Sequence, residues 1–264
     1  MNAPVQAVLA EVTDGVGRLT ISSLARHNAL TLDMWQALGD RMAMFDADPD
    51  VRVIVLTGEG EKSFCVGADI SEFEAKRATK EQAEHYEHVV ETAMMRIQAC
   101  RKPTIAMIHG YCIGGGVEVA MSCDLRIAST EARFGVPAAR LGIGYAYWAV
   151  SLLSDLIGPA AAKEIFYTAR QFNAEEGLRM GFFQQVLPPA DLAGFVDGYC
   201  RQIAVNAPLS MASAKRCIAE HLKDADQQNR AAALQTIEDC ALSEDYAEGR
   251  RAFMEKRKPV FRGR

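Results

Sequence analysis

The chain has 264 residues, 49% of them hydrophobic, and a formal net charge of −5. This length and apolar content are sufficient for one large hydrophobic core with a small appendage. The negative balance argues against nucleic acid as a partner. The apolar runs are interrupted before the roughly 18 residues that a membrane-spanning helix needs, so we expect no membrane association.

The cysteines and the N-terminal segment indicate a reducing compartment. The seven cysteines are an odd number without the spacing of metal ligands, and we expect reduced thiols that are mostly buried. The segment "MNAPVQAVLAEVTDG" has neither a basic start nor the apolar core of a signal peptide. We therefore expect a cytoplasmic protein without a metal site.

Strands and helices alternate in the first part of the chain. Glycine between two short segments indicates a hairpin, apolar periodicity after a threonine cap indicates a helix, and continuous apolar runs indicate buried strands. In chain order these signals predict a hairpin at 8–22, a helix at 31–49 capped by Thr31, a strand at 51–60, a helix at 79–100, and strands at 102–110 and 124–129.

Strand signals almost vanish beyond residue 150. The segment "QQVL" (184–187) is the one plausible strand there, and the other segments, including 226–256, predict helices. This order of elements predicts an α/β protein with a helical C-terminal region.

Two glycine-rich turns each follow a predicted strand. Gly114, Gly115 and Gly116 precede a short apolar helix, and the free N–H groups of a helix start attract negative charge. Glu118 lies in that helix, where a carboxylate is costly to bury without a partner or a function. The second turn, "VGAD" at 66–69, also opens a helix. Two such turns can aim two N–H groups at one oxygen, which is the geometry of an oxyanion hole.

Four motifs follow one another along the chain: "FCVGADISEF", "GYCIGGGVEVAMSCDLRIAS", "ARFGVPAARLGIG" and "SEDYAEGRRAFMEKRKPVF". In this order and spacing they resemble the crotonase superfamily, also called the enoyl-CoA hydratase/isomerase family. The resemblance implies a crotonase-type spiral of ββα units over 1–200 and a helical trimerisation region over 201–264. It also implies an acyl-CoA thioester substrate, a homotrimer or dimer of trimers, and no cofactor other than the coenzyme A of the substrate.

The resemblance assigns roles to particular positions. It places the thioester oxygen between the N–H groups of Ala68 and Gly115, where fixed donors stabilise an enolate. Glu118 matches one of two catalytic glutamates of the hydratases. The positions that match the family's coenzyme A contacts are Arg26, Ala29, Val66, Asp69, Ile70, Phe253 and Lys256, of which the last two lie in a tail that often reaches a neighbouring subunit.

The second hydratase glutamate is missing from this sequence. The family pattern "FGxPE" is "FGVPA" here, which leaves Ala138 at the position of the acid. Loss of one acid or base typically costs about 10²–10⁴ in rate. Tyr145, in "LGIGYAYWAV", matches a tyrosine of the branch that contains methylmalonyl-CoA decarboxylase, and it is a candidate catalytic residue.

Several functions stay open from the sequence. The first is an enzyme of the enoyl-CoA hydratase/isomerase type, most simply a lyase. Decarboxylation of a methylmalonyl-CoA-like thioester and thioester hydrolysis use the same enolate or oxyanion chemistry. The alternative class is a non-catalytic acyl-CoA-binding subunit that kept the fold. Glu118 and the two intact glycine turns favour the enzyme.

Overall fold

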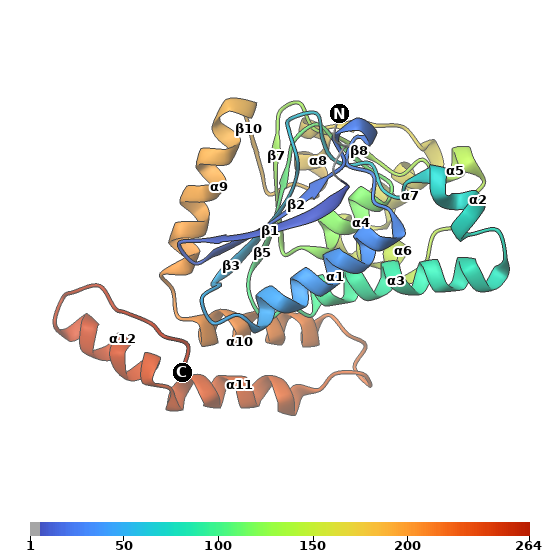
Figure 1. The fold of residues 1–264 in the computed structure, drawn as a ribbon. Coiled ribbons are helices and arrows are strands. Elements are labelled where there is room, and N and C mark those ends of the chain that lie inside the picture. Colours follow the sequence, from blue (N-terminus) through green and yellow to red (C-terminus); the bar gives the residue numbers. More distant parts are fainter. Residues whose placement is uncertain (1–5) are drawn as a thin grey trace.

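Two β-sheets form the centre of the fold in the computed structural model, which describes residues 6–264 (Figure 1). The larger sheet has the order β1-β2-β3-β5-β7-β10, and the smaller sheet has the order β4-β6-β8-β9. The strands are β1 (Ala7–Thr13), β2 (Val16–Ser22), β3 (Val53–Gly58), β4 (Ser63–Cys65), β5 (Thr104–Ile108), β6 (Tyr111–Ile113), β7 (Leu125–Ser129), β8 (Arg133–Gly135), β9 (Phe172–Asn173) and β10 (Gln185–Leu187).

The strand pairings repeat along the chain. β1 and β2 form the predicted antiparallel hairpin, and β2, β3, β5, β7 and β10 then pair in parallel. In the smaller sheet β4, β6 and β8 are parallel, and β9 joins β8 antiparallel. A long strand of the larger sheet is thus followed by a short strand of the smaller one in β3–β4, β5–β6 and β7–β8. The predicted α/β spiral of ββα units is therefore confirmed.

Helices surround the two sheets and continue into the C-terminal region (Figure 1). The predicted caps are present, since the side chain of Thr31 accepts a hydrogen bond from Met34 N and that of Thr79 accepts one from Gln82 N. The helices are η1 (Leu24–Arg26), α1 (Leu32–Ala47), η2 (Ile70–Glu72), α2 (Phe73–Lys76), α3 (Lys80–Gln98), α4 (Gly115–Ser122), α5 (Ala138–Leu141), α6 (Tyr147–Ile157), α7 (Pro159–Thr168), α8 (Ala174–Met180), α9 (Pro189–Ala204), α10 (Pro208–His221), α11 (Arg230–Leu242) and α12 (Glu244–Met254).

The central strands of the larger sheet, β3 and β5, are buried on both faces. Val53 and Val55 of β3 pack in one cluster with Leu192 and Val196 of α9, while Ile54 of the same strand packs in the main core. Alternate residues of a strand point to opposite faces, so a strand covered on both sides is apolar at every position. This burial explains the continuous apolar run that predicted the strand.

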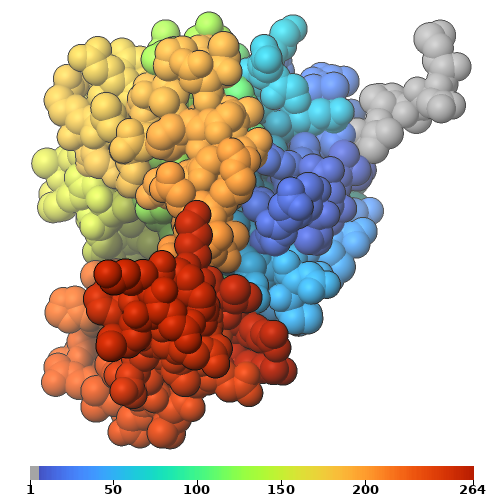
Figure 2. Space-filling view, turned by 90° about the vertical axis from the view of Figure 1, so that its left-hand side faces the viewer, coloured from blue at the N-terminus to red at the C-terminus, as the bar shows by residue number. Residues whose placement is uncertain are grey.

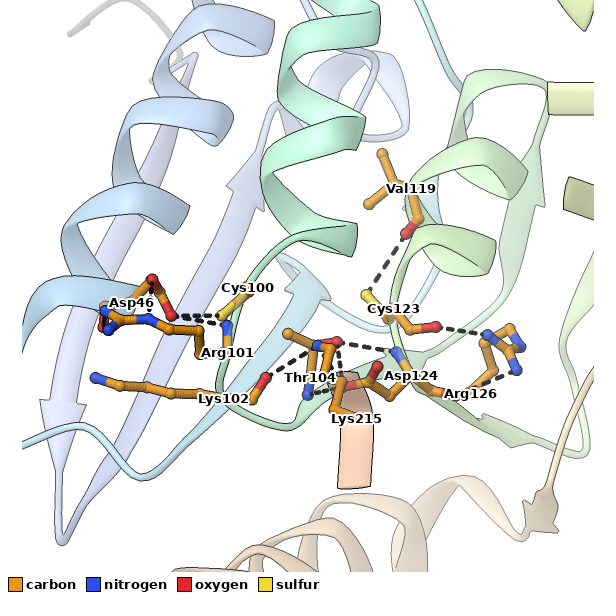
Figure 3. A network of polar contacts seen from close by, with 10 residues as sticks. All are labelled: Asp46, Cys100, Arg101, Lys102, Thr104, Val119, Cys123, Asp124, Arg126 and Lys215. Carbon is orange, nitrogen blue, oxygen red and sulfur yellow. Dashed lines mark hydrogen bonds and ion pairs between the residues drawn. The ribbon is translucent and has the colours of Figure 1, made fainter. Parts of the chain in front are cut away.

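The C-terminal helices form a lobe below the core (Figures 1 and 2). Lys215 of α10 ties this lobe to the core (Figure 3): its ammonium donates to Asp124 Oδ2 at 2.8 Å and to the Lys102 carbonyl at 3.1 Å. Asp124 in turn accepts from the backbone N–H of Thr104 at 2.8 Å. The helical character predicted for 201–264 is confirmed, and its role in trimerisation stays a prediction.

The smaller sheet departs from the sequence prediction. Its strands have two or three residues each and were not predicted, and β9 adds a second strand beyond residue 150, where only "QQVL" was expected. Strands this short show no periodicity of their own, so their pairing depends on the neighbouring sheet. None of the helices described over 6–264 combines the length and apolar character needed to cross a bilayer.

Candidate active site

A cavity of about 260 Å³ contains both glycine turns. Its walls come from elements distant in sequence, including α1, the β4–η2 turn, α3, the start of α4 and the segment around α5. The lining residues are Trp35, Val66, Ala68, Ile70, Phe73, Arg77, Tyr86, Glu87, Val90, Glu91, Gly114, Gly115, Glu118, Pro137, Ala138, Leu141, Ile143, Gly144, Tyr145, Ala146 and Trp148. The structure therefore brings together the four residues predicted to be catalytic, Ala68, Gly115, Glu118 and Tyr145.

The two glycine turns are in direct contact. Gly67 has a φ of +90°, and a Cβ at this position would lie 2.7 Å from the backbone nitrogen of Gly115. A Cβ at Gly115 would in turn lie 3.1 Å from the Cα of Gly67. Only glycine permits both the positive φ and this close approach of two backbones.

The N–H groups of Ala68 and Gly115 are available to a ligand. Leu30 and Ala68 form a parallel β-bridge. The backbone N–H of Leu30 donates to Gly67 O, and its carbonyl accepts from Asp69 N, both at 2.8 Å. The N–H of Ala68, between these two residues, therefore points away from Leu30. Gly115 is the first residue of α4, where N–H groups lack partners within the helix. Within residues 6–264 neither N–H donates to a protein acceptor. Their convergence on one oxygen stays a prediction.

Glu118 lies in the first turn of α4 and faces the cavity. Burial raises the pKa of its carboxyl group to about 7, because the charged form loses its hydration. The Tyr145 hydroxyl and the charge of Arg77 lower the pKa and partly offset this effect. A carboxyl group with this pKa is divided between its acid and base forms near neutral pH, as a proton carrier requires.

Tyr145 is the partner of Glu118 inside the cavity. Burial, followed by the nearby Glu118 charge, raises the pKa of its phenol well above the ordinary value. The hydroxyl therefore stays protonated. The ring is held by an edge contact with Phe166, with 5.4 Å between ring centroids. Ala138, which the resemblance matches to the second hydratase acid, begins α5, lines the same cavity and is 6% exposed.

The predicted coenzyme A contacts divide into two groups, of which the first lies beside the cavity. Val66 and Ile70 line it, and Ile70 is 65% exposed at its edge. Arg26, at the end of η1, forms an ion pair with Asp69, which precedes η2. Burial alone would raise the pKa of Asp69, but hydrogen bonds from Ser71 and Arg26 hold it below the ordinary value. Asp69 thus has a structural role as the cap of η2.

The remaining predicted contacts lie away from the cavity. Ala29 is buried in the protein interior and does not line the cavity. Phe253 is 82% exposed on α12, and Lys256 follows that helix with a φ of +53°. Figure 1 shows α12 at the opposite end of the molecule from α2 and α5. Within one chain these two residues do not reach the site, so any contact they make with a ligand there requires another copy.

Sequence reasoning missed an arginine and two aromatic residues of the cavity. Arg77 follows the four-residue helix α2, whose length gives no periodic signal. Trp35 of α1 and Tyr86 of α3 are joined by a hydrogen bond from Trp35 Nε1 to the Tyr86 hydroxyl at 3.2 Å. Both look like ordinary core positions in sequence. In the part of the chain that the structure describes, no cluster of three or more His, Cys, Asp or Glu side chains is arranged to hold a metal ion.

The parallel ββα spiral and its paired glycine turns define a member of the enoyl-CoA hydratase/isomerase family. Residues 11–264 match the sequence model of that family, and the chain belongs to it.

Similar proteins cover nearly the whole chain. The short-chain-enoyl-CoA hydratase of Clostridium acetobutylicum is 34% identical over 251 residues, which are 95% of both chains. The (E)-benzylidenesuccinyl-CoA hydratase of Thauera aromatica is 35% identical, over 97% of this chain and 99% of that protein. The crystal structure of an enoyl-CoA hydratase/carnithine racemase from Magnetospirillum magneticum superposes with a TM-score of 0.93 at 34% identity, over 98% and 97% of the two chains.

Proposed function

We propose that this protein converts an enoyl-CoA thioester through an enolate whose oxygen is held by the N–H groups of Ala68 and Gly115. One observation carries the proposal: Glu118, with a pKa of about 7, lies in the same cavity as the two contacting glycine turns. Removing or adding a proton next to a thioester carbonyl places negative charge on that oxygen. A fixed donor there is typically worth about 3–4 kcal/mol to the transition state.

Glu118 is the proton carrier in this mechanism. Its ionised form takes a proton from the substrate or from water, and its protonated form returns a proton to the enolate carbon. Tyr145 donates a hydrogen bond to the ionised form and keeps the group near its balanced state. This chemistry uses only groups of the protein, so we propose that coenzyme A enters as part of the substrate and that no separate cofactor takes part.

Hydration and double-bond isomerisation are the two leading reactions. The names of relatives from Clostridium acetobutylicum and Thauera aromatica favour hydration. The buried Ala138 favours isomerisation, because one carboxylate suffices to move a proton between two carbons of the same substrate. Decarboxylation also yields an enolate, and Glu118 in its protonated form is suited to quench it.

An acyl-CoA panel read by mass spectrometry tests the proposal. Addition of water, loss of CO₂ and release of free CoA differ in mass, and an isomer is resolved by its chromatographic retention. We expect conversion of short trans-2-enoyl-CoA substrates, and Glu118→Gln should lower it by about 10²–10⁴. Glu91→Gln is the matched control, since Glu91 lines the same cavity but is exposed. If no thioester in the panel is converted, the protein is a binding subunit.

We also propose a cytoplasmic homotrimer or dimer of trimers. Large apolar side chains are exposed on the last two helices, among them Ile237 at 51%, Leu242 at 87% and Phe253 at 82%. A second copy that covers them removes this apolar surface from water. Light scattering on the purified protein measures the number of copies, and a monomer at micromolar concentration contradicts the proposal.

A further inference from the structure

We propose that Arg77 binds a carboxylate at the far end of the acyl chain, so that the preferred substrates are ω-carboxyacyl-CoA thioesters. The inference rests on the proposed function and names its substrate class. Among the cavity-lining residues of the described chain, Arg77 is the only basic one. A cation inside an otherwise largely apolar cavity favours a ligand with an anionic group that can pair with it.

The guanidinium group of Arg77 is held in place by its surroundings. It packs 4.8 Å from the ring centroid of Phe73 and 4.9 Å from that of Tyr86. Its Nη2 donates to Glu87 Oε1 at 3.1 Å. The Arg77 side chain is 24% exposed, whereas that of Glu87 is 67% exposed. Arg77 is therefore fixed on two aromatic faces, and its one acidic partner lies largely in solvent.

Arg77 retains donors for a ligand. A guanidinium carries five N–H donors, and within residues 6–264 Glu87 is its only side-chain acceptor. The planar group matches a carboxylate through two parallel hydrogen bonds. The other acids lining the cavity are Glu91, which is exposed, and Glu118, which is partly protonated at neutral pH. Neither is paired with Arg77, so its positive charge is only partly balanced by the protein.

A chain of contacts links Arg77 to the proposed thioester position. A Cβ at Gly115 would lie 3.2 Å from Trp35 Cζ2, Trp35 hydrogen bonds to Tyr86, and the Tyr86 ring packs on Arg77. Two aromatic side chains thus lie on the path of contacts between the guanidinium and the oxyanion donor. Within residues 6–264 Arg77 forms no hydrogen bond with Glu118, although its charge lowers the pKa of that carboxyl group. A carboxylate bound by Arg77 belongs at the distal end of the acyl chain and not on the carbon next to the thioester.

Binding of matched saturated thioesters tests the inference without turnover. The pairs are butyryl-CoA and succinyl-CoA, hexanoyl-CoA and adipoyl-CoA, and octanoyl-CoA and suberoyl-CoA, which differ in having a terminal methyl or a carboxylate. We expect the wild-type protein to bind the carboxylated member of at least one pair about 10- to 100-fold more tightly, as is typical for a hydrogen bond to a charged group. Arg77→Met should abolish this preference and leave the affinity for the methyl-ended thioester unchanged.

Arg96→Met provides the control, because Arg96 forms an ion pair with Asp40 on the surface and does not line the cavity. It should keep the wild-type preference. If Arg77→Met weakens both members of a pair equally, Arg77 binds the coenzyme A phosphates and the inference is wrong. If the wild-type protein shows no preference in any pair, the inference is wrong while the proposed function stands. If no thioester binds, both are wrong.

Discussion

The Tyr145 phenol and the Glu118 carboxyl group line the same cavity, and each shifts the pKa of the other. The two side chains come from different elements, since Glu118 lies on α4 and Tyr145 precedes α6. Burial drives the pKa values of both groups upward, the Tyr145 hydroxyl lowers that of Glu118, and the Glu118 charge raises that of Tyr145 further. The phenol therefore stays protonated, and it favours the ionised carboxylate.

The pH dependence of the reaction should report this pair. If ionised Glu118 is the base, kcat/KM of the wild-type enzyme rises with pH through about 7, the pKa of the buried carboxyl group. Tyr145→Phe removes the hydroxyl that lowers this pKa, so the rising limb should move to higher pH. Tyr167→Phe, at a tyrosine that is 75% exposed, should leave the profile unchanged. An identical limb in wild type and Tyr145→Phe would show that the hydroxyl does not act on Glu118.

The contact between the glycine turns gives a second prediction. Gly67→Ala introduces a Cβ 2.7 Å from Gly115 N and should displace one oxyanion donor. We expect kcat to fall by about 10²–10³, the usual effect of losing one such donor. Gly181→Ala is the control, because Gly181 has a φ of +80° but no atom within 4 Å of the added Cβ. Comparable activity of the two variants would argue that the donors do not act together.

The sequence predicted the strands of the larger sheet better than those of the smaller one. β3 and β5 are continuous apolar runs because both faces of their sheet are covered, so their signal is local. β4, β6 and β8 have three residues each, and their identity as strands comes from pairing with one another across long stretches of chain. No local pattern contains that information.

The candidate site shows the same difference between local and distant signals. Gly115 and Glu118 could be predicted because one motif contains both, and Ala68 because its turn follows the same pattern. Arg77 was not predicted, since "EAKRATK" resembles an exposed basic segment. Its role depends on the packing of its guanidinium on Tyr86, which α3 brings into place.

The link between the C-terminal lobe and the core should contribute to stability. Lys215→Met removes the ammonium that bridges Asp124 and the Lys102 carbonyl, and its side chain is only 19% exposed. We expect the free energy of unfolding to fall by about 1.5–3 kcal/mol, a typical value for a hydrogen bond to a charged group. Denaturant unfolding measures the change. Lys80→Met, at a side chain that is 83% exposed, should have almost no effect.

The position of Lys256 leads to a prediction about assembly. Because this residue does not line the cavity of its own chain, a role in binding coenzyme A requires a neighbouring copy. If it meets a phosphate there, Lys256→Glu should raise KM with little change in kcat, and the penalty should shrink in high salt. Lys163→Glu, at an exposed lysine of α7, is the control. Equal KM values for wild type and Lys256→Glu at low salt would show that Lys256 is a surface residue that does not contact coenzyme A.

Substitutions at the apolar position 138 can distinguish two hypotheses: a weakened hydratase, and an enzyme that catalyses another reaction. Ala138→Glu places a carboxylate in the same cavity as Glu118, at the position that the sequence resemblance assigns to the second hydratase acid. If hydration is limited by that missing group, turnover of crotonyl-CoA should rise by about 10²-fold, a typical contribution of one acid or base.

Ala138→Gln tests whether such a gain comes from the proton or from the shape of the side chain. The amide has nearly the same size but does not titrate, so it should give no gain. Ala138 is buried and lines the same cavity as Tyr145 and Trp148. If neither variant gains activity while Tyr145→Phe lowers the native rate, the protein uses its enolate site for proton transfer without water.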